Sequence, residues 1–190
     1  MSRREPREEG FTLIEVLAAT VILSVASMAM LAFFINAMSY NKGNQNKTVM
    51  VNLARNALFY MEKQNYATIH NYFIDSSTGE LKEHNPPISS NDCSTRNICD
   101  KPDLQNLFLN PNMKLLWDVL NPKVNDIEYQ ISVSYQVDIA NELKDDPVKK
   151  GMANYLLPIR VEVSVKDNNV NNGRNKPVIV EGYIANESIR

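Results

Sequence analysis

GFTLIEVLAATVILSVASMAMLAFFI, residues 10–35, is the stretch that decides the fold class of this 190-residue chain. Its last twenty residues, 16–35, carry no charge, and their polar side chains are those of Thr20, Ser24 and Ser27. As a helix rising about 1.5 Å per residue they span about 30 Å, which is the thickness of a bilayer core. Such a helix is apolar on all sides, which favours contact with lipid over burial in a soluble core. The stretch therefore predicts a membrane-spanning helix.

A cleaved secretory signal is the alternative interpretation of such a run. The apolar region of a secretory signal usually has about 7–15 residues and ends at small residues in an A-x-A-like cleavage site. Here the run is longer, and the segment that follows, NAMSYNKGNQNK (36–47), contains no strong site of that kind. We therefore expect the helix to remain in the mature protein.

Glu15 interrupts the beginning of this apolar stretch. A carboxylate within a membrane segment costs about 2.5–3.5 kcal/mol on insertion scales, so it usually has a partner and a function. At the membrane interface the cost is small, and Glu15 would then need no partner. The residue alone does not decide between these two interpretations.

The residues around Glu15 favour a function. A short polar leader, MSRREPREE (1–9), precedes the hexapeptide G-F-T-L-I-E and the apolar run. This arrangement resembles the class III signal of type IV pilins and related pseudopilins. The resemblance implies that a prepilin peptidase cleaves between Gly10 and Phe11, that Phe11 becomes the N-methylated terminus, and that Glu15 pairs with the terminal amine of a neighbouring subunit. Opposite charges attract strongly in a low-dielectric filament core, where each offsets the burial cost of the other.

The helix is expected to continue beyond the membrane. No proline lies between Pro6 and Pro86, and Gly43 is the weak point of the helical pattern. Apolar residues then recur at helical spacing, at positions 50, 54, 57, 58 and 61. These patterns predict one helix from about residue 11 to about residue 64, whose second half is amphipathic and packs on a soluble domain.

The C-terminal third shows the two-residue period of β-strands. Apolar and polar residues alternate over 127–139 and again over 159–165, and PVIVEGYIA (177–185) gives a third, looser strand. Polar, turn-rich segments connect the three. The sequence therefore predicts an antiparallel β-meander packed against the long helix, which is an α+β fold. A type IV pilin-like fold, which the resemblance implies, has the same plan.

These features divide the chain into a prepilin leader (1–10), a transmembrane and filament-core helix (11–35), its amphipathic continuation (36–64) and a periplasmic globular domain with the antiparallel sheet (65–190). Within this domain, residues 65–122 are interpreted mainly as turns and loops, with short helices over 102–109 and 113–120. Trp117 is expected to be a core residue.

Cys93 and Cys99 are the two cysteines, and both lie in a polar segment. They form neither a C-x-x-C redox motif nor half of a zinc site with further cysteines or histidines nearby. Two interpretations remain, a small-loop disulfide and a pair of free thiols. The disulfide is favoured, and it implies an oxidising compartment.

No motif for catalysis or metal binding is found. His70 and His84 are expected in loops, and they form neither an H-x-x-x-H nor an H-E-x-x-H spacing. A net charge of −2, without a cluster of lysine and arginine, argues against nucleic acid as a direct ligand. We therefore expect a protein that is not an enzyme and has no cofactor or metal.

Within the family, the chain is most similar to minor pilins of the PilV-like type. The resemblance implies a structural subunit that joins or primes the pilus, with other minor and major pilins, the prepilin peptidase and the inner membrane as partners. Its implied location is the inner membrane, crossed once with the C-terminal domain in the periplasm, and later the filament or its tip. Two alternatives stay open: a minor pseudopilin of a type II secretion system, and a membrane-tethered periplasmic binding module that does not assemble. Twitching motility, adhesion and DNA uptake share one scaffold, so the fold does not choose among them.

Overall fold

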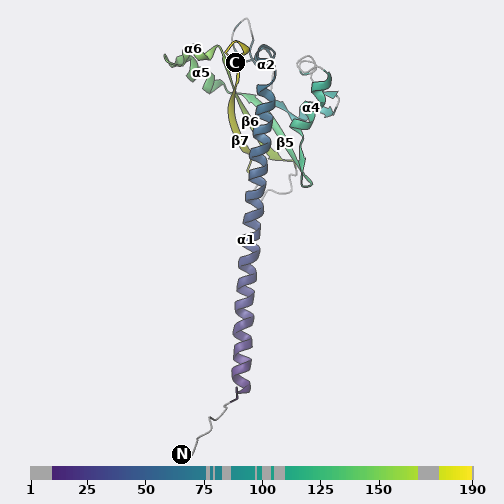
Figure 1. Ribbon diagram of the computed structural model, residues 1–190, viewed down its shortest axis with the longest axis vertical. Coiled ribbons are helices and arrows are strands. Elements are labelled where there is room, and N and C mark those ends of the chain that lie inside the picture. The colour runs from purple at the N-terminus through teal and green to yellow at the C-terminus, as the bar shows by residue number, and fades with distance from the viewer. Residues whose placement is uncertain are drawn as a thin grey trace, which may run out of the picture. The chain divides into compact units, whose positions relative to one another are not determined.

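The computed structural model describes residues 10–75, 78, 80–82, 87–96, 98–99, 104, 110–166 and 176–189 (Figure 1). The chain divides into two compact units, Met1–Asn44 and Gln45–Arg190. The described elements are α1 (Leu13–Glu62), α2 (Tyr66–Phe73), β1 (Ile88–Ser89), η1 (Ser90–Asp92), β2 (Cys93–Thr95), β3 (Ile98–Cys99), α4 (Asn110–Leu120), β4 (Lys123–Val124), β5 (Ile127–Tyr135), α5 (Val137–Asp145), α6 (Lys150–Ala153), β6 (Leu156–Val165), β7 (Val178–Ala185) and η3 (Glu187–Ile189). Apart from Leu104, the short helix expected over 102–109 lies outside the described residues.

Helix α1 is continuous over 50 residues and passes through Gly43 without interruption. In the first unit, every described residue from 10 to 38 is exposed. By length and composition, α1 is long and apolar enough to cross a membrane. The long apolar helix predicted from the sequence is therefore confirmed.

In the second unit, α1 presents one apolar stripe to the sheet. Met50, Ala54, Ala57 and Met61 are buried, and the helical period places all four on one face. Leu58, beside this stripe, lies against β7 at Gly182. A Cβ atom added to Gly182 would lie only 2.7 Å from Cδ2 of Leu58. A side chain at position 182 would therefore require Leu58 or the helix to shift.

The sheet has the order β1-β5-β6-β7, and β4 pairs with the beginning of β5. β5, β6 and β7 form the predicted antiparallel meander, in which Val161 pairs with Val133 on one side and with Val180 on the other. In Figure 1 the second half of α1 lies along these three strands. The short strand β1, which the alternation did not predict, adds to the other side of β5.

The predicted strand over 127–139 is wrong at its end. β5 stops at Tyr135, and the next residues form α5. Ala140 and Leu143, three residues apart, are buried together on one face of that helix. Burial at helical spacing therefore outweighs the two-residue alternation at the end of the predicted strand.

The segment between α1 and β5 contains more helix than expected. α2 begins after Asn65, whose Oδ1 accepts a hydrogen bond of 3.0 Å from the backbone N–H of Thr68. His70 therefore lies on a helix and not in a loop, whereas His84 lies outside the described residues. α4 confirms the second short helix predicted in this segment, and Trp117 packs, partly buried, against the core.

Candidate functional site

The N-terminal candidate residues lie where α1 begins. The backbone N–H of Thr12 donates to Oε2 of Glu15 at 2.9 Å, and the Thr12 hydroxyl donates to the same oxygen at 3.0 Å. In return, Oγ1 of Thr12 accepts from the backbone N–H of Glu15 at 3.4 Å. These reciprocal bonds form a capping box, which satisfies N–H groups that the first turn of a helix leaves unpaired.

The capped carboxylate stays accessible. Glu15 is exposed in the described part of the chain, and the partial positive charge of the helix N-terminus favours an acidic group at this position. A cation supplied by another molecule can therefore reach the carboxylate without unfolding the helix. The role of Thr12 was readable in the sequence, because T-x-x-E ahead of an apolar run is the signature of this cap.

The peptide bond between Gly10 and Phe11 lies just before the cap. Phe11 is 89% exposed, and a Cβ atom added to Gly10 would meet no described atom within 4 Å. The described residues thus leave room for another protein at this bond. Cleavage at Gly10 and methylation of Phe11 stay predictions.

The first half of α1 presents an apolar surface whose polar groups are already satisfied. The hydroxyl of Thr20 donates to the Leu17 carbonyl at 2.8 Å, that of Ser24 to the Thr20 carbonyl at 2.7 Å, and that of Ser27 to the Leu23 carbonyl at 2.8 Å. In an apolar environment an unpaired hydroxyl is costly, and these bonds remove that cost. This part of α1 is therefore suited to apolar surroundings around its whole circumference.

The cysteine pair belongs to the second unit. Cys93 and Cys99 are joined by a disulfide and face each other across the β2–β3 pair. Arg96, in the turn between these strands, forms a hydrogen-bonded ion pair with Asp118 of α4. The small loop is thus fastened both covalently and to a neighbouring helix.

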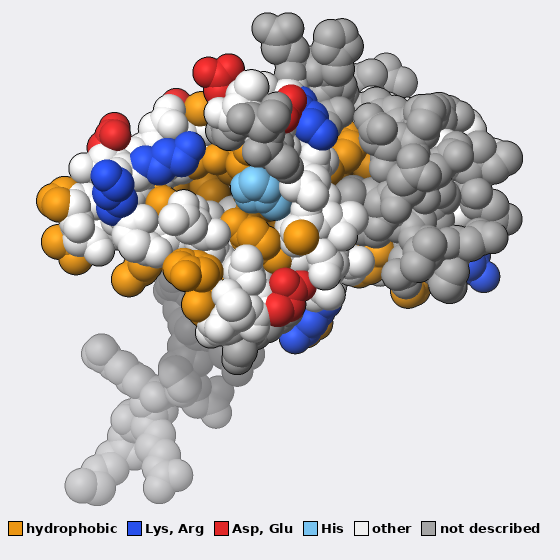
Figure 2. Space-filling model, turned by 90° about the horizontal axis from the view of Figure 1, so that it is seen from above, with side chains coloured by type: hydrophobic (Ala, Val, Ile, Leu, Met, Phe, Trp, Pro, Cys, Tyr) orange, Lys and Arg blue, Asp and Glu red, His pale blue; other side chains and the backbone are white. Residues whose placement is uncertain are grey.

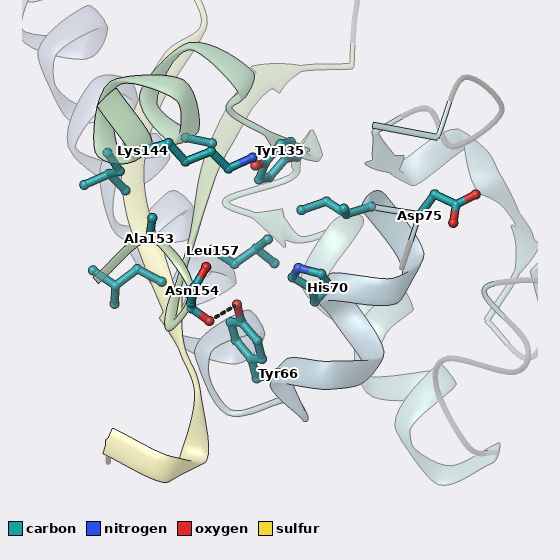
Figure 3. A pocket seen from close by; sticks show the side chains of 12 residues that line it. Tyr66, His70, Asp75, Tyr135, Lys144, Ala153, Asn154 and Leu157 are labelled. Carbon is teal, nitrogen blue, oxygen red and sulfur yellow. Dashed lines mark hydrogen bonds between the residues drawn. The ribbon is translucent and has the colours of Figure 1, made fainter. Parts of the chain in front are cut away.

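Among the described residues, no three His, Cys, Asp or Glu side chains lie close enough together to hold a metal ion. His70 instead lines a cavity in the second unit, together with residues of α5 and β6 (Figure 3). Within the second unit, neither Cys93 nor Cys99 lines this cavity.

Comparison with known proteins bears on the N-terminal segment. Residues 6–31 match the family model described as the prokaryotic N-terminal methylation motif, and this match includes Gly10, Phe11 and Glu15. The chain is 28% identical, over 104 residues, to the type IV major pilin protein PilA of Myxococcus xanthus (strain DK1622). That alignment covers 54% of this chain and 47% of the relative, so the chain spans about half the length of the curated relative it matches. No solved structure matches the chain.

Proposed function

We propose that this member of the type IV pilin family is a minor pilin, a structural subunit that joins or primes the pilus filament. The N-terminal methylation motif, the similarity to a major pilin and the long apolar helix followed by an antiparallel sheet support the family. The opening GFTLIEVLAATVIL and the position of the cysteine pair in the middle of the chain favour the minor type.

The main support for this proposal is the apolar surface of α1. Over the segment that could span a membrane, the described residues bury none of it. Exposed apolar surface of this extent marks a membrane or protein contact. Before assembly, the lipid of the inner membrane covers this apolar surface. In the filament, the equivalent helices of neighbouring subunits replace the lipid.

In the proposed filament, the pairing of Glu15 sets the position of each subunit relative to its neighbour. In a single subunit Thr12 satisfies the carboxylate. In the filament, the methylated amine of a neighbour's Phe11 adds a full positive charge, and the ion pair forms in surroundings of low dielectric constant. Because Phe11 precedes Glu15 in the chain, this pairing offsets neighbouring parallel helices along their axes.

The other partners follow from this arrangement. The prepilin peptidase cleaves between Gly10 and Phe11 at the cytoplasmic face of the inner membrane, and other minor and major pilins surround α1 after assembly. The globular domain lies in the periplasm, where oxidising conditions maintain the disulfide between Cys93 and Cys99.

Two substitutions of Glu15 test the proposal. Glu15→Ala removes both the charge and the cap, whereas Glu15→Gln removes the charge and keeps a side chain that suits a capping box. The amount of each variant is measured by immunoblot in sheared filaments and in membranes. Both variants should fall at least about tenfold in filaments, because a buried charge that loses its partner costs several kcal/mol. Both should remain at normal levels in membranes.

Glu62→Gln, at the other end of α1, is the matched control and should assemble as the unmodified chain does. Normal incorporation of Glu15→Gln would contradict the charge pairing and leave the cap as the whole role of Glu15. Normal incorporation of Glu15→Ala as well, or absence of the unmodified chain from filaments, would contradict the proposed function.

A further inference from the structure

A cavity of about 220 Å³ lies in the globular unit between α2, α5 and the beginning of β6 (Figure 3). Its walls are mixed: Ile74, Leu143 and Leu157, each of which is buried, provide apolar surface, and side chains such as His70 and Lys144 provide polar groups. Figure 2 shows a histidine side chain with hydrophobic side chains beside it on the face viewed from above. The cavity is smaller than the roughly 300–1,000 Å³ of sites for drug-sized ligands, so it suits a ligand with one ring or a short chain.

Two phenol groups line the cavity. The Tyr66 hydroxyl donates to the Asn154 carbonyl at 3.1 Å, which fixes the position of its ring. Burial, followed by the effect of Tyr66, raises the pKa of Tyr135, and burial alone raises the pKa of Tyr66. Both hydroxyls therefore remain protonated near neutral pH and keep their ability to take part in hydrogen bonds.

Two nitrogen-bearing side chains reach the same cavity from different helices, His70 from α2 and Lys144 from α5 (Figure 3). His70 stacks at a tilt on Tyr66, with ring centroids 5.5 Å apart. Within the described residues, neither the imidazole nor the ammonium group has a hydrogen bond or an ion pair. Asp75, the acidic residue among those lining the cavity, points away from the other labelled side chains in Figure 3. The cavity therefore combines apolar surface with a cation that lacks a counter-ion in the described part of the chain.

We propose that this cavity binds a small free carboxylic acid whose apolar body is one ring or a short chain. The Lys144 ammonium pairs with the carboxylate, since charge-assisted hydrogen bonds are the stronger kind. His70 supplies a further polar contact, and the apolar part of the walls takes up the body of the ligand. This site goes beyond filament assembly and does not depend on it, because its residues lie in the globular unit and not in the exposed half of α1.

The test is a titration of the full chain, in lipid nanodiscs, with 3-phenylpropionate, followed by NMR chemical shifts of the residues that line the cavity. The neutral probe 3-phenylpropanamide has the same size and apolar body but no charge. The acid should give saturable shifts at the cavity, and the amide should bind about tenfold more weakly, because it lacks the charge-assisted contact.

Lys144→Gln removes the charge and keeps a polar side chain that is one atom shorter. Lys144 is exposed, so the fold should be retained. This variant should bind the acid about tenfold more weakly and the amide unchanged. Lys150→Gln, a lysine of the neighbouring α6 that does not line the cavity, is the matched control and should bind both probes normally. Equal binding of acid and amide, an unchanged affinity in Lys144→Gln, or no saturable shift up to the solubility limit of the acid would each overturn the proposal.

Discussion

Thr12 and Glu15 are joined by hydrogen bonds at the start of α1, next to the residues for which we propose a role in assembly. Their reciprocal hydrogen bonds close the first turn and place a carboxylate at the positive end of the helix. The proposed pairing with a neighbour's amine would therefore compete with, or add to, this internal cap. The cap and the ion pair are separate properties of one side chain, and they can be tested separately.

Thr12→Ala tests the helix cap separately from the charge of Glu15. The substitution removes the hydroxyl that accepts from the Glu15 N–H, which should destabilise the first turn by about 1 kcal/mol and speed hydrogen exchange of its amides about fivefold. Exchange is measured by NMR on the full chain in nanodiscs. Thr20→Ala is the control, because the Thr20 hydroxyl bonds to the Leu17 carbonyl within the helix. Unchanged exchange in Thr12→Ala would mean that the cap does not hold the helix start.

Ionisation of Tyr60 should make the stability of the globular unit depend on pH in the alkaline range. Burial raises the pKa of Tyr60 to about 12, whereas an unfolded tyrosine ionises near pH 10. Between these values the unfolded state has lost the proton and the folded state has kept it, so stability falls as pH rises. Below about pH 10 this residue makes no contribution to the pH dependence.

Chemical denaturation at a series of pH values checks this expectation. The free energy of unfolding should decline between about pH 10 and about pH 12, and the decline should be smaller in Tyr60→Phe. Burial raises the pKa of Tyr129 in the same direction, so part of the decline should persist in that variant. An equal decline in both proteins would show that Tyr60 is not a source of it.

At the scale of elements, periodicity predicted the main parts of the fold. The first half of the long helix follows from its uninterrupted apolar run, its second half from a helical spacing of apolar residues, and the meander from a spacing of 2 residues. The failure at the end of β5 has a physical cause, since residues 137 and 139 fit the alternation while Ala140 and Leu143 fit a helix. In so short a segment the strand and helix patterns fit equally well, and burial in the folded domain determines which structure forms. The same applies to α2, whose eight residues are too few for a secure helical pattern.

The contact between α1 and β7 depends on Gly182. In Gly182→Ala the new methyl group would lie 2.7 Å from Leu58 Cδ2, so the helix or the leucine must shift. We expect a loss of about 1–3 kcal/mol in the free energy of unfolding of the globular unit, which is typical of overpacking. Denaturant unfolding followed by Trp117 fluorescence measures it.

Gly151→Ala is the control, because a Cβ atom at that position would meet no described atom within 4 Å. It should be neutral or slightly stabilising, since alanine favours a helix more than glycine does. Adding Leu58→Ala to Gly182→Ala should cost less than the sum of the two single losses, because the second change relieves the clash. Strict additivity would rule out the clash as the cause.

On the scale of the whole molecule, the two units were not equally predictable. The proposed N-terminal site is contiguous in sequence, so Gly10, Phe11 and Glu15 could be predicted from the resemblance of one short segment to the class III signal. The cavity could not be predicted, because His70, Lys144 and Leu157 come from elements far apart in the chain and meet only in the folded domain. A site within one short segment can be predicted from a sequence motif. A site between several elements can be found only once the fold is known.

We propose that the leader is removed and that α1 then enters a filament from its new terminus. The most direct test is the N-terminal mass of the protein recovered from membranes of cells with an active prepilin peptidase. A chain that begins at N-methylated Phe11 is the expected result, and it would leave Glu15 as the fifth residue of the mature subunit. A chain that still begins at Met1 in those cells would contradict prepilin processing, and with it the filament account.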